Sequence, residues 1–153
     1  MARSNDTVKA ILLAGLAAGI LDITAACVIF GLRGASPLEV FQSVASGLLG
    51  SETYKGGWAT ALLGGLLHFF IATVAAAVYH SASGVLRFLV RRPVISGLLY
   101  GVAVYLFMNL VVLPLSAVAK RPFAPCMAAI LIVVHMVCVG LPIALATRRH
   151  ARR

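Results

Sequence analysis

The sequence predicts an all-α polytopic membrane protein, a bundle of four transmembrane helices with one short external amphipathic helix. The composition is 61% hydrophobic and 11% charged, whereas soluble domains are about 45–50% apolar. The mean hydropathy is +1.02. Four apolar runs, at about 10–30, 57–79, 94–118 and 124–146, are each long enough to cross the membrane, because a helix of ~20 residues spans a ~30 Å hydrocarbon core.

The four runs leave no stretch long enough for a soluble domain, so residues 1–153 are expected to form a single transmembrane domain. The first run follows Lys9, as a secretory signal would follow its positive charge. It is longer than a typical signal segment, however, and Asp22 interrupts it. We therefore expect a helix that is retained in the membrane.

The distribution of charge predicts the topology. The formal net charge is +9, and nine of the 13 Lys and Arg residues belong to one predicted side: Arg3, Lys9, Arg87, Arg91, Arg92, Arg148, Arg149, Arg152 and Arg153. The other side receives Arg33, Lys55, Lys120 and Arg121. The positive-inside rule then predicts that both termini lie in the cytoplasm.

Membrane lipids are the partners that this charge predicts. The basic tail after the fourth run is expected to contact anionic lipids at the membrane surface. Nucleic acid is not an expected partner, because interleaved aromatic residues and base-reading motifs are absent from the sequence.

Residues 37–49 predict a short helix on the external surface. Ser36 can serve as the N-cap, Pro37 suits the first helical position, and Glu39 completes a capping box. Apolar and polar residues alternate at helical spacing on two faces, Leu38, Phe41, Val44 and Leu48 against Glu39, Gln42, Ser43 and Ser46. The apolar face is expected to lie on the membrane. Such a helix would be a plain cover over the bundle or a gate over an entrance.

Prolines and aromatic residues predict where the runs bend and end. Pro142 lies inside the fourth run and should kink it, which releases the carbonyl near Cys138. Pro122 and Pro125 bracket the last external turn and predict a stiff hairpin. Tyr79 falls at the end of the second run, where aromatic rings prefer the membrane interface.

Each apolar run carries one strongly polar residue near its middle: Asp22, His68, Asn109 and His135. At a rise of about 1.5 Å per residue, all four are expected within about one helical turn in depth. Tyr105, one turn before Asn109, would extend this layer inward. A polar side chain inside hydrocarbon is costly unless it is partnered, so the four residues predict a shared polar layer.

Two interpretations of the layer are open. Asp22 is the only acid inside a predicted span, and a carboxyl group beside a histidine can titrate near neutral pH, which favours a proton or ion site in a small transport or permeation component. Alternatively, Asp22 is bonded to His68 or His135 and only locks the helices together, in a structural or assembly subunit. Asn109 would then be a hydrogen-bonding contact between helices.

The two histidines also raise a cofactor hypothesis. Spans two and four run in the same direction, so His68 and His135 would be able to ligate a b-type haem axially. Glycines are the candidates to make room for the macrocycle, namely Gly64, Gly65 and Gly140. A transition metal held by Asp22, His68 and His135 is a further alternative. The favoured expectation is a protein without a cofactor, and no motif in the sequence predicts an enzyme.

Pairs of glycines predict close helix packing. Gly15 and Gly19 in the first run, and Gly97 and Gly101 in the third, match the small-xxx-small pattern of membrane helix contacts. Their recurrence is also compatible with a duplicated two-helix unit. Four helices leave little room for a transport pathway enclosed by one chain, so we expect a homo-oligomer or a partner membrane protein. These glycines are the candidate contact faces.

The three cysteines do not form a recognisable motif. Cys27 and Cys126 are both expected near the external face, where a disulfide is one possibility and two small apolar residues are the other. Cys138 is expected inside the membrane.

Several segments resemble an uncharacterised family of small four-span bacterial inner-membrane proteins. The segments are residues 36–50, Leu66–Phe70, Met108–Leu115, and His135 with the Gly140–Pro142 turn. The resemblance covers nearly the whole chain. It implies a location in the cytoplasmic membrane, and it implies no activity, substrate or catalytic residue.

Overall fold

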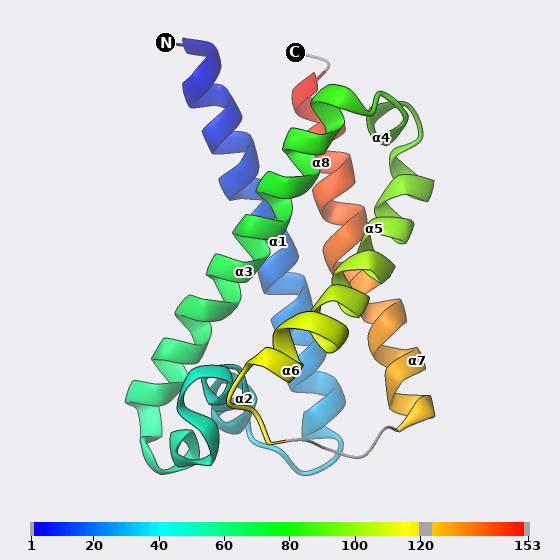
Figure 1. Ribbon diagram of the computed structural model, residues 1–153. Helices are drawn as coiled ribbons and strands as arrows, with labels where there is room; N and C mark the ends of the chain where they lie inside the picture. The colour runs from blue at the N-terminus through cyan, green and yellow to red at the C-terminus, as the bar shows by residue number, and fades with distance from the viewer. Residues whose placement is uncertain (1, 120–123, 152–153) are drawn as a thin grey trace.

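The all-α fold is confirmed by a computed structural model, which describes residues 2–119 and 124–151 and the side chains from Asn5 onwards (Figure 1). No strand occurs in these residues. Four helical segments are long and apolar enough to cross a membrane: Asn5–Gly31, Gly57–Val85, Pro93–Leu115 and Pro125–Ala151. The chain is therefore a multi-pass membrane protein.

Two of the spanning segments are continuous α-helices, α1 (Ala2–Gly31) and α3 (Gly57–Val85). The other two contain π-helical turns. The third segment consists of α5 (Pro93–Phe107), the π-helical η2 (Met108–Val112) and α6 (Leu113–Leu115). The fourth consists of α7 (Pro125–Val134), the π-helical η3 (His135–Gly140) and α8 (Leu141–Ala151). The connections hold α2 (Pro37–Leu49), the 3₁₀-helical η1 (Gly50–Lys55) and α4 (Phe88–Arg91).

A proline stands two residues after the end of each π-helical turn. The backbone N–H before each proline donates to a carbonyl five residues back, Leu113 to Met108 before Pro114, and Leu141 to Met136 before Pro142. A proline has no N–H, and its ring clashes with the carbonyl four residues back, so a wider turn accommodates it. The irregularity predicted at Pro142 is thus a π-helical turn, a feature that is frequent at functional sites.

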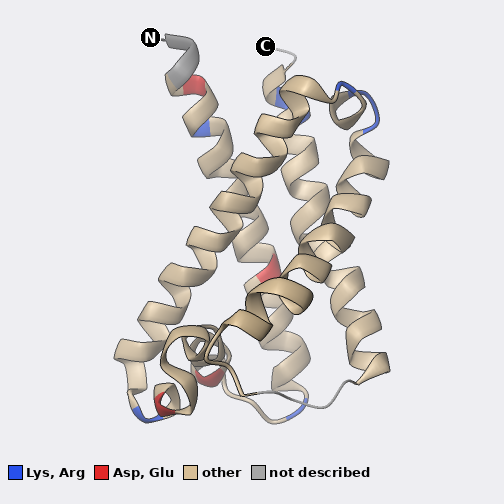
Figure 2. Cartoon of the chain, in the orientation of Figure 1, with Lys and Arg blue, Asp and Glu red and all other residues tan. Residues whose placement is uncertain are grey.

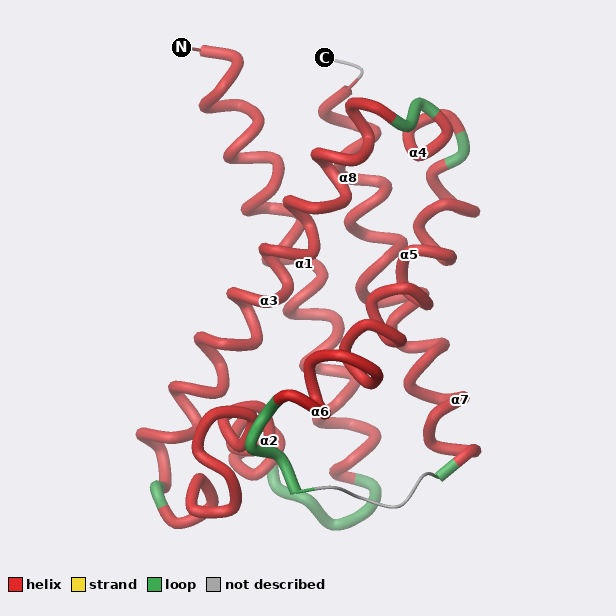
Figure 3. The backbone as a smooth tube through the Cα atoms, in the orientation of Figure 1, coloured by secondary structure: helices red, strands yellow, loops and turns green. Residues whose placement is uncertain are grey.

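Helix α1 contacts two other spanning segments, while its remaining surface is exposed. It packs against α3 on one side and against η3 and α8 on the other, and the fourth segment packs in turn against α5. The start of α1, the end of α8 and α4 lie at one end, whereas α2, η1, α6 and the start of α7 lie towards the other (Figure 1). Figure 3 shows loops only at these two ends of the described chain, as the hydrocarbon region requires.

Small residues let α1 and α3 approach closely. A methyl group added to Gly15 would lie 2.6 Å from Thr73 Cα, and one added to Gly19 would lie 2.7 Å from the ring of Phe69. Ala18 is fully buried in the same region. These glycines are therefore covered by α3 of the same chain, and they are not free to form the contact between copies that we expected.

The second glycine pair packs the third spanning segment against the fourth. A methyl group on Gly97 would lie 2.9 Å from the carbonyl oxygen of Gly140, and one on Gly101 would overlap the backbone of His135. The α5 backbone therefore touches the backbone of η3, a contact that only glycine allows. This pair, too, is covered within one chain and does not form an external contact face.

Helix α2 begins and ends where the sequence predicts, and its capping box is confirmed. The backbone N–H of Ser36 donates to Glu39 Oε2 at 2.7 Å, and the N–H of Glu39 donates to Ser36 Oγ at 3.3 Å. Part of the polar face packs against the protein, which the pattern did not predict. Gln42 is 1% exposed, whereas Leu48 is 63% exposed.

Hydrogen bonds explain why Gln42 is buried, together with Val40, Ala45 and Ser46. Gln42 Nε2 donates to the carbonyl of Gly57 at 3.0 Å and to Thr60 Oγ1 at 3.1 Å, at the start of α3. Gly64 leaves room for the backbone of Phe41 to approach α3. The amide side chain of Gln42 thus connects α2 to α3. Sequence periodicity cannot predict such a contact, because it separates polar from apolar residues without identifying their partners.

Tyr79 was expected at the membrane interface; it lies near the end of α3, and its side chain is buried within the protein. Its hydroxyl lies 2.8 Å from Ser96 Oγ and donates to the carbonyl of Leu89 at 3.1 Å. Tyr100 packs edge-on against Tyr79 and donates to the carbonyl of Ala75 at 2.7 Å. Because these partners come from α3, α4 and α5, the hydrogen bonds of the two tyrosines connect these three helices at one end of the bundle.

The three cysteines, all within the described residues, are free thiols, so the alternative of a Cys27–Cys126 disulfide is not realised. Some sequence predictions fall outside the described residues and are not addressed: the basic residues Lys120, Arg121, Arg152 and Arg153, and Pro122 in the predicted turn.

Candidate polar site within the membrane

An acid and a histidine face each other inside the bundle. Asp22, on α1, has its Oδ1 atom 4.0 Å from Nδ1 of His135, the first residue of η3, and each side chain is 19% exposed. Figure 2 shows an acidic segment halfway along α1, far from the charged residues at the two ends. The sequence therefore brings two ionisable groups together where hydrocarbon surrounds the helices.

The hydrogen bond predicted between Asp22 and a histidine is not formed. His135 Nδ1 lies 2.9 Å from the carbonyl oxygen of Leu131, one turn earlier in the same segment. A carbonyl only accepts, so Nδ1 must be the donor. The carboxyl oxygen of Asp22, at 4.0 Å from Nδ1, lies beyond hydrogen-bonding distance.

Tyr105 lies beside this pair, and Asn109 follows one turn later in the same segment. The ring of Tyr105 stands edge-on to the ring of His135, with centroids 5.5 Å apart. Asn109 Nδ2 donates to the carbonyl of Tyr105 at 2.9 Å. This amide therefore bonds within its own helix, at the start of η2, and the contact between helices that we expected from Asn109 is not formed.

His68 is engaged elsewhere. Its Nε2 atom lies 2.9 Å from the carbonyl oxygen of Gly19, so this nitrogen donates to the backbone of α1. Its ring also stands edge-on to Phe69. His68 thus joins α3 to α1, while Asp22 meets His135 where α1 packs against the fourth segment. The predicted layer divides into a cluster of Asp22, Tyr105, Asn109 and His135, and a separate contact at His68.

The cofactor alternatives receive no geometric support. Within the described residues, no three His, Cys, Asp or Glu side chains converge as metal ligands, so the three-ligand metal site is wrong. The space that a haem needs is also filled. An added methyl group would meet Phe41 at Gly64 and at Gly65, and would meet Gly97 and Gly101 at Gly140. The two histidines of the haem hypothesis are present, but the three glycines expected to leave room for the macrocycle are covered by other residues.

Sequence reasoning missed the π-helical turns that carry two members of this cluster. Asn109 lies in η2, and His135 begins η3. A signal was present, because the pattern Met-x₅-Pro occurs twice, at residues 108–114 and 136–142. Both copies coincide with a π-helical turn, and the carbonyl and side-chain directions there differ from those of a regular helix.

No protein-family model, curated protein sequence or solved structure matches this chain.

Proposed function

We propose that this chain is a small transport or permeation component whose Asp22–His135 pair takes up and releases a proton. The observation that carries the proposal is the 4.0 Å approach of a carboxyl group and an imidazole within two spanning segments. Ionisable residues inside spans are costly and rare, and they are found at proton relays and ion pathways.

The two groups have complementary chemistry. Nδ1 of His135 is committed to the carbonyl of Leu131, which leaves Nε2 to exchange a proton. The nearby carboxylate of Asp22 stabilises the imidazolium that results. A proton that binds at this pair is therefore held between α1 and η3, which belong to different spanning segments.

We also propose a bacterial inner-membrane location with both termini in the cytoplasm. The support is the distribution of charge (Figure 2), since basic side chains gather at the end that holds the termini, namely Lys9, Arg87, Arg91, Arg92, Arg148 and Arg149. Four spans offer little room for a pathway enclosed by one chain, so a homo-oligomer or a partner membrane protein is part of the proposal.

One observation favours a second candidate, a structural or assembly subunit. His68, Asn109 and His135 each donate to a backbone carbonyl, and no buried side-chain nitrogen or oxygen in the described residues lacks a partner. Under this alternative the polar residues only fix the register between helices.

Proton flux into proteoliposomes tests the proposal. Vesicles that enclose a pH-sensitive dye receive the purified protein, and a potassium gradient with valinomycin sets the membrane potential. We expect the wild type to carry protons faster than protein-free vesicles, and Asp22→Asn to abolish that flux while the thermal unfolding midpoint is retained, because the amide has the size of the carboxyl but does not titrate.

Asp6→Asn is the matched control, since it makes the same change on the exposed part of the same helix. It should leave the flux unchanged. A wild type without flux, or an Asp22→Asn variant as active as the wild type, would contradict the proton proposal and favour the structural subunit.

A further inference from the structure

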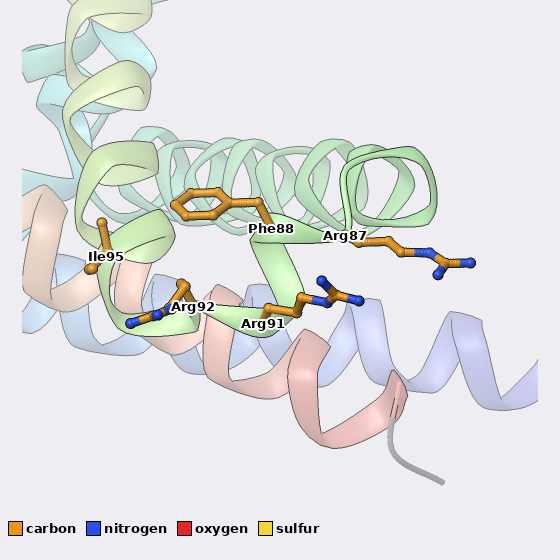
Figure 4. A pocket seen from close by; sticks show the side chains of 5 residues that line it. All are labelled: Arg87, Phe88, Arg91, Arg92 and Ile95. Carbon is orange, nitrogen blue, oxygen red and sulfur yellow. The ribbon is translucent and has the colours of Figure 1, made fainter.

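A concave basic surface lies between α3 and α5, apart from the polar cluster. Its pocket, of about 570 Å³, is lined by Arg87, Phe88, Arg91, Arg92 and Ile95 (Figure 4). Two spanning segments end beside it, one at Val85 and the other at Pro93. The pocket therefore lies at the level where the hydrocarbon core of a bilayer meets the headgroups.

The positive charge of this pocket is not neutralised within the described residues. Arg87, Arg91 and Arg92 are all exposed. The ion pairs among the described residues lie elsewhere, namely Lys55–Glu52 and His135–Asp22. In Figure 4, Arg87 and Arg91 extend to one side and Arg92 extends towards the opposite side, below Phe88. An anion at the pocket would thus meet guanidinium groups that have no competing carboxylate.

Apolar side chains form the rest of the pocket. Phe88 and Ile95 are each 50% exposed, and Figure 4 shows the ring of Phe88 pointing towards α5, the helix that carries Ile95. A soluble phosphate ion gains nothing from contact with these two apolar side chains. A phospholipid presents its phosphate directly beside its acyl chains, so both kinds of side chain find a partner on one molecule.

We propose that this pocket binds the phosphodiester headgroup of an anionic phospholipid. In the bound state the exposed side chains of Arg87, Arg91 and Arg92 turn towards the pocket and contact the phosphate oxygens, which arginine recognises through paired hydrogen bonds. Phe88 and Ile95 contact the first methylenes of the acyl chains. Basic pockets between transmembrane helices bind anionic headgroups on the cytoplasmic side by this combination. The proposal does not depend on the proton chemistry of Asp22 and His135.

Native mass spectrometry of the purified full chain in a mild detergent tests this directly. The probe is a short-chain phosphatidylglycerol, titrated against phosphatidylcholine of the same chain length. We expect one phosphatidylglycerol to bind tightly, phosphatidylcholine to bind at least about tenfold more weakly, and Arg91→Gln/Arg92→Gln to lose at least about tenfold in affinity for phosphatidylglycerol. Both arginines are exposed and form no ion pair, so the double variant is expected to fold.

The matched control is Lys9→Gln/Arg149→Gln, which removes the same charge from two exposed positions at the same end of the bundle. It should change the affinity less than about twofold. An equal loss in both double variants would overturn the site in favour of general charge attraction. If millimolar inorganic phosphate displaced phosphatidylglycerol, the pocket would be a site for free phosphate, and the lipid proposal would be overturned. Should a variant fail to fold, the two lipids are still compared on the wild type, where equal affinities would overturn the proposal.

Discussion

A methyl group added to Gly101 has no free space, because it overlaps the backbone of His135 in the facing segment. We expect Gly101→Ala to lower the free energy of unfolding by about 1–3 kcal/mol, the usual cost of overpacking. Gly84→Ala is the matched control. Gly84 lies in helix α3 with nothing near its missing side chain, so alanine should be neutral or stabilising there. Unfolding in a denaturing detergent measures both, and equal stabilities would contradict the close contact.

The geometry of Asp22 also sets the stability effect of removing it. Since Asp22 accepts no hydrogen bond from His135, whose Nδ1 already donates to Leu131, its loss leaves no stranded donor. We expect Asp22→Ala and Asn109→Ala to shift the free energy of unfolding by similar amounts, about 0.6 kcal/mol, as is typical of polar contacts in membranes. A selective loss of ~3–5 kcal/mol in Asp22→Ala, measured in the same unfolding assay, would indicate a buried ionised pair instead.

The residue types in the polar cluster were predictable, but their partners were not. Asp22, Asn109 and His135 stand out in the sequence because hydrocarbon penalises polar groups. Which atom each one bonds to depends on a rotation of about 100° per residue around the helix. A single added residue in a π-helical turn changes that rotation. His68 lies on the regular helix α3, and the rotation of that helix directs it to the backbone of Gly19 and not to another member of the predicted layer.

At the scale of elements, α2 offers a prediction about pH. The backbone N–H of Ser36, followed by its hydroxyl, holds the pKa of Glu39 below its ordinary value of 4.5. A carboxyl group with a lowered pKa stabilises the fold above the unfolded pKa, and that contribution is lost as the pH falls through the lowered value. We therefore expect the start of α2 to fray as the pH falls below 4.5.

Hydrogen–deuterium exchange of the first turn of α2, corrected for intrinsic rates, measures this fraying. Glu39→Gln provides the control, because its amide oxygen still accepts from Ser36 but does not titrate over this range. Protection in the variant should not change with pH. A wild type whose protection is equally flat would show that the capping box does not respond to acid.

Element bounds were predicted more successfully than element faces. Ser36, Pro37 and Glu39 fix the start of α2 through local chemistry, which a sequence displays directly. The face that α2 buries depends on a partner 15 residues away, the carbonyl of Gly57 that accepts from Gln42. The same distinction applies to Tyr79, whose position at the end of a run predicted an interface and whose partner Ser96 lies on another helix.

At the scale of the whole molecule, the testable quantity is orientation. With both termini in the cytoplasm, fusions of a periplasm-active enzyme at Ser51 and Arg121 should be active, and a fusion at Gly84 should be inactive. Ser51 lies in η1 and Gly84 near the end of α3, at opposite ends of the bundle. Arg121 lies outside the described residues. The inverse pattern of activity would reverse the proposed orientation and leave the fold unchanged.

The contacts of α1 with both α3 and the fourth spanning segment have a consequence for biogenesis. Its contact with α3 can form early, because His68 and Gly19 are 49 residues apart and α3 follows α1 closely during synthesis. Its contact with His135 must wait for the fourth of these spanning segments, which is synthesised after the other three. Helix α1 therefore acquires these neighbours in two steps, and the second step is the docking of the fourth segment.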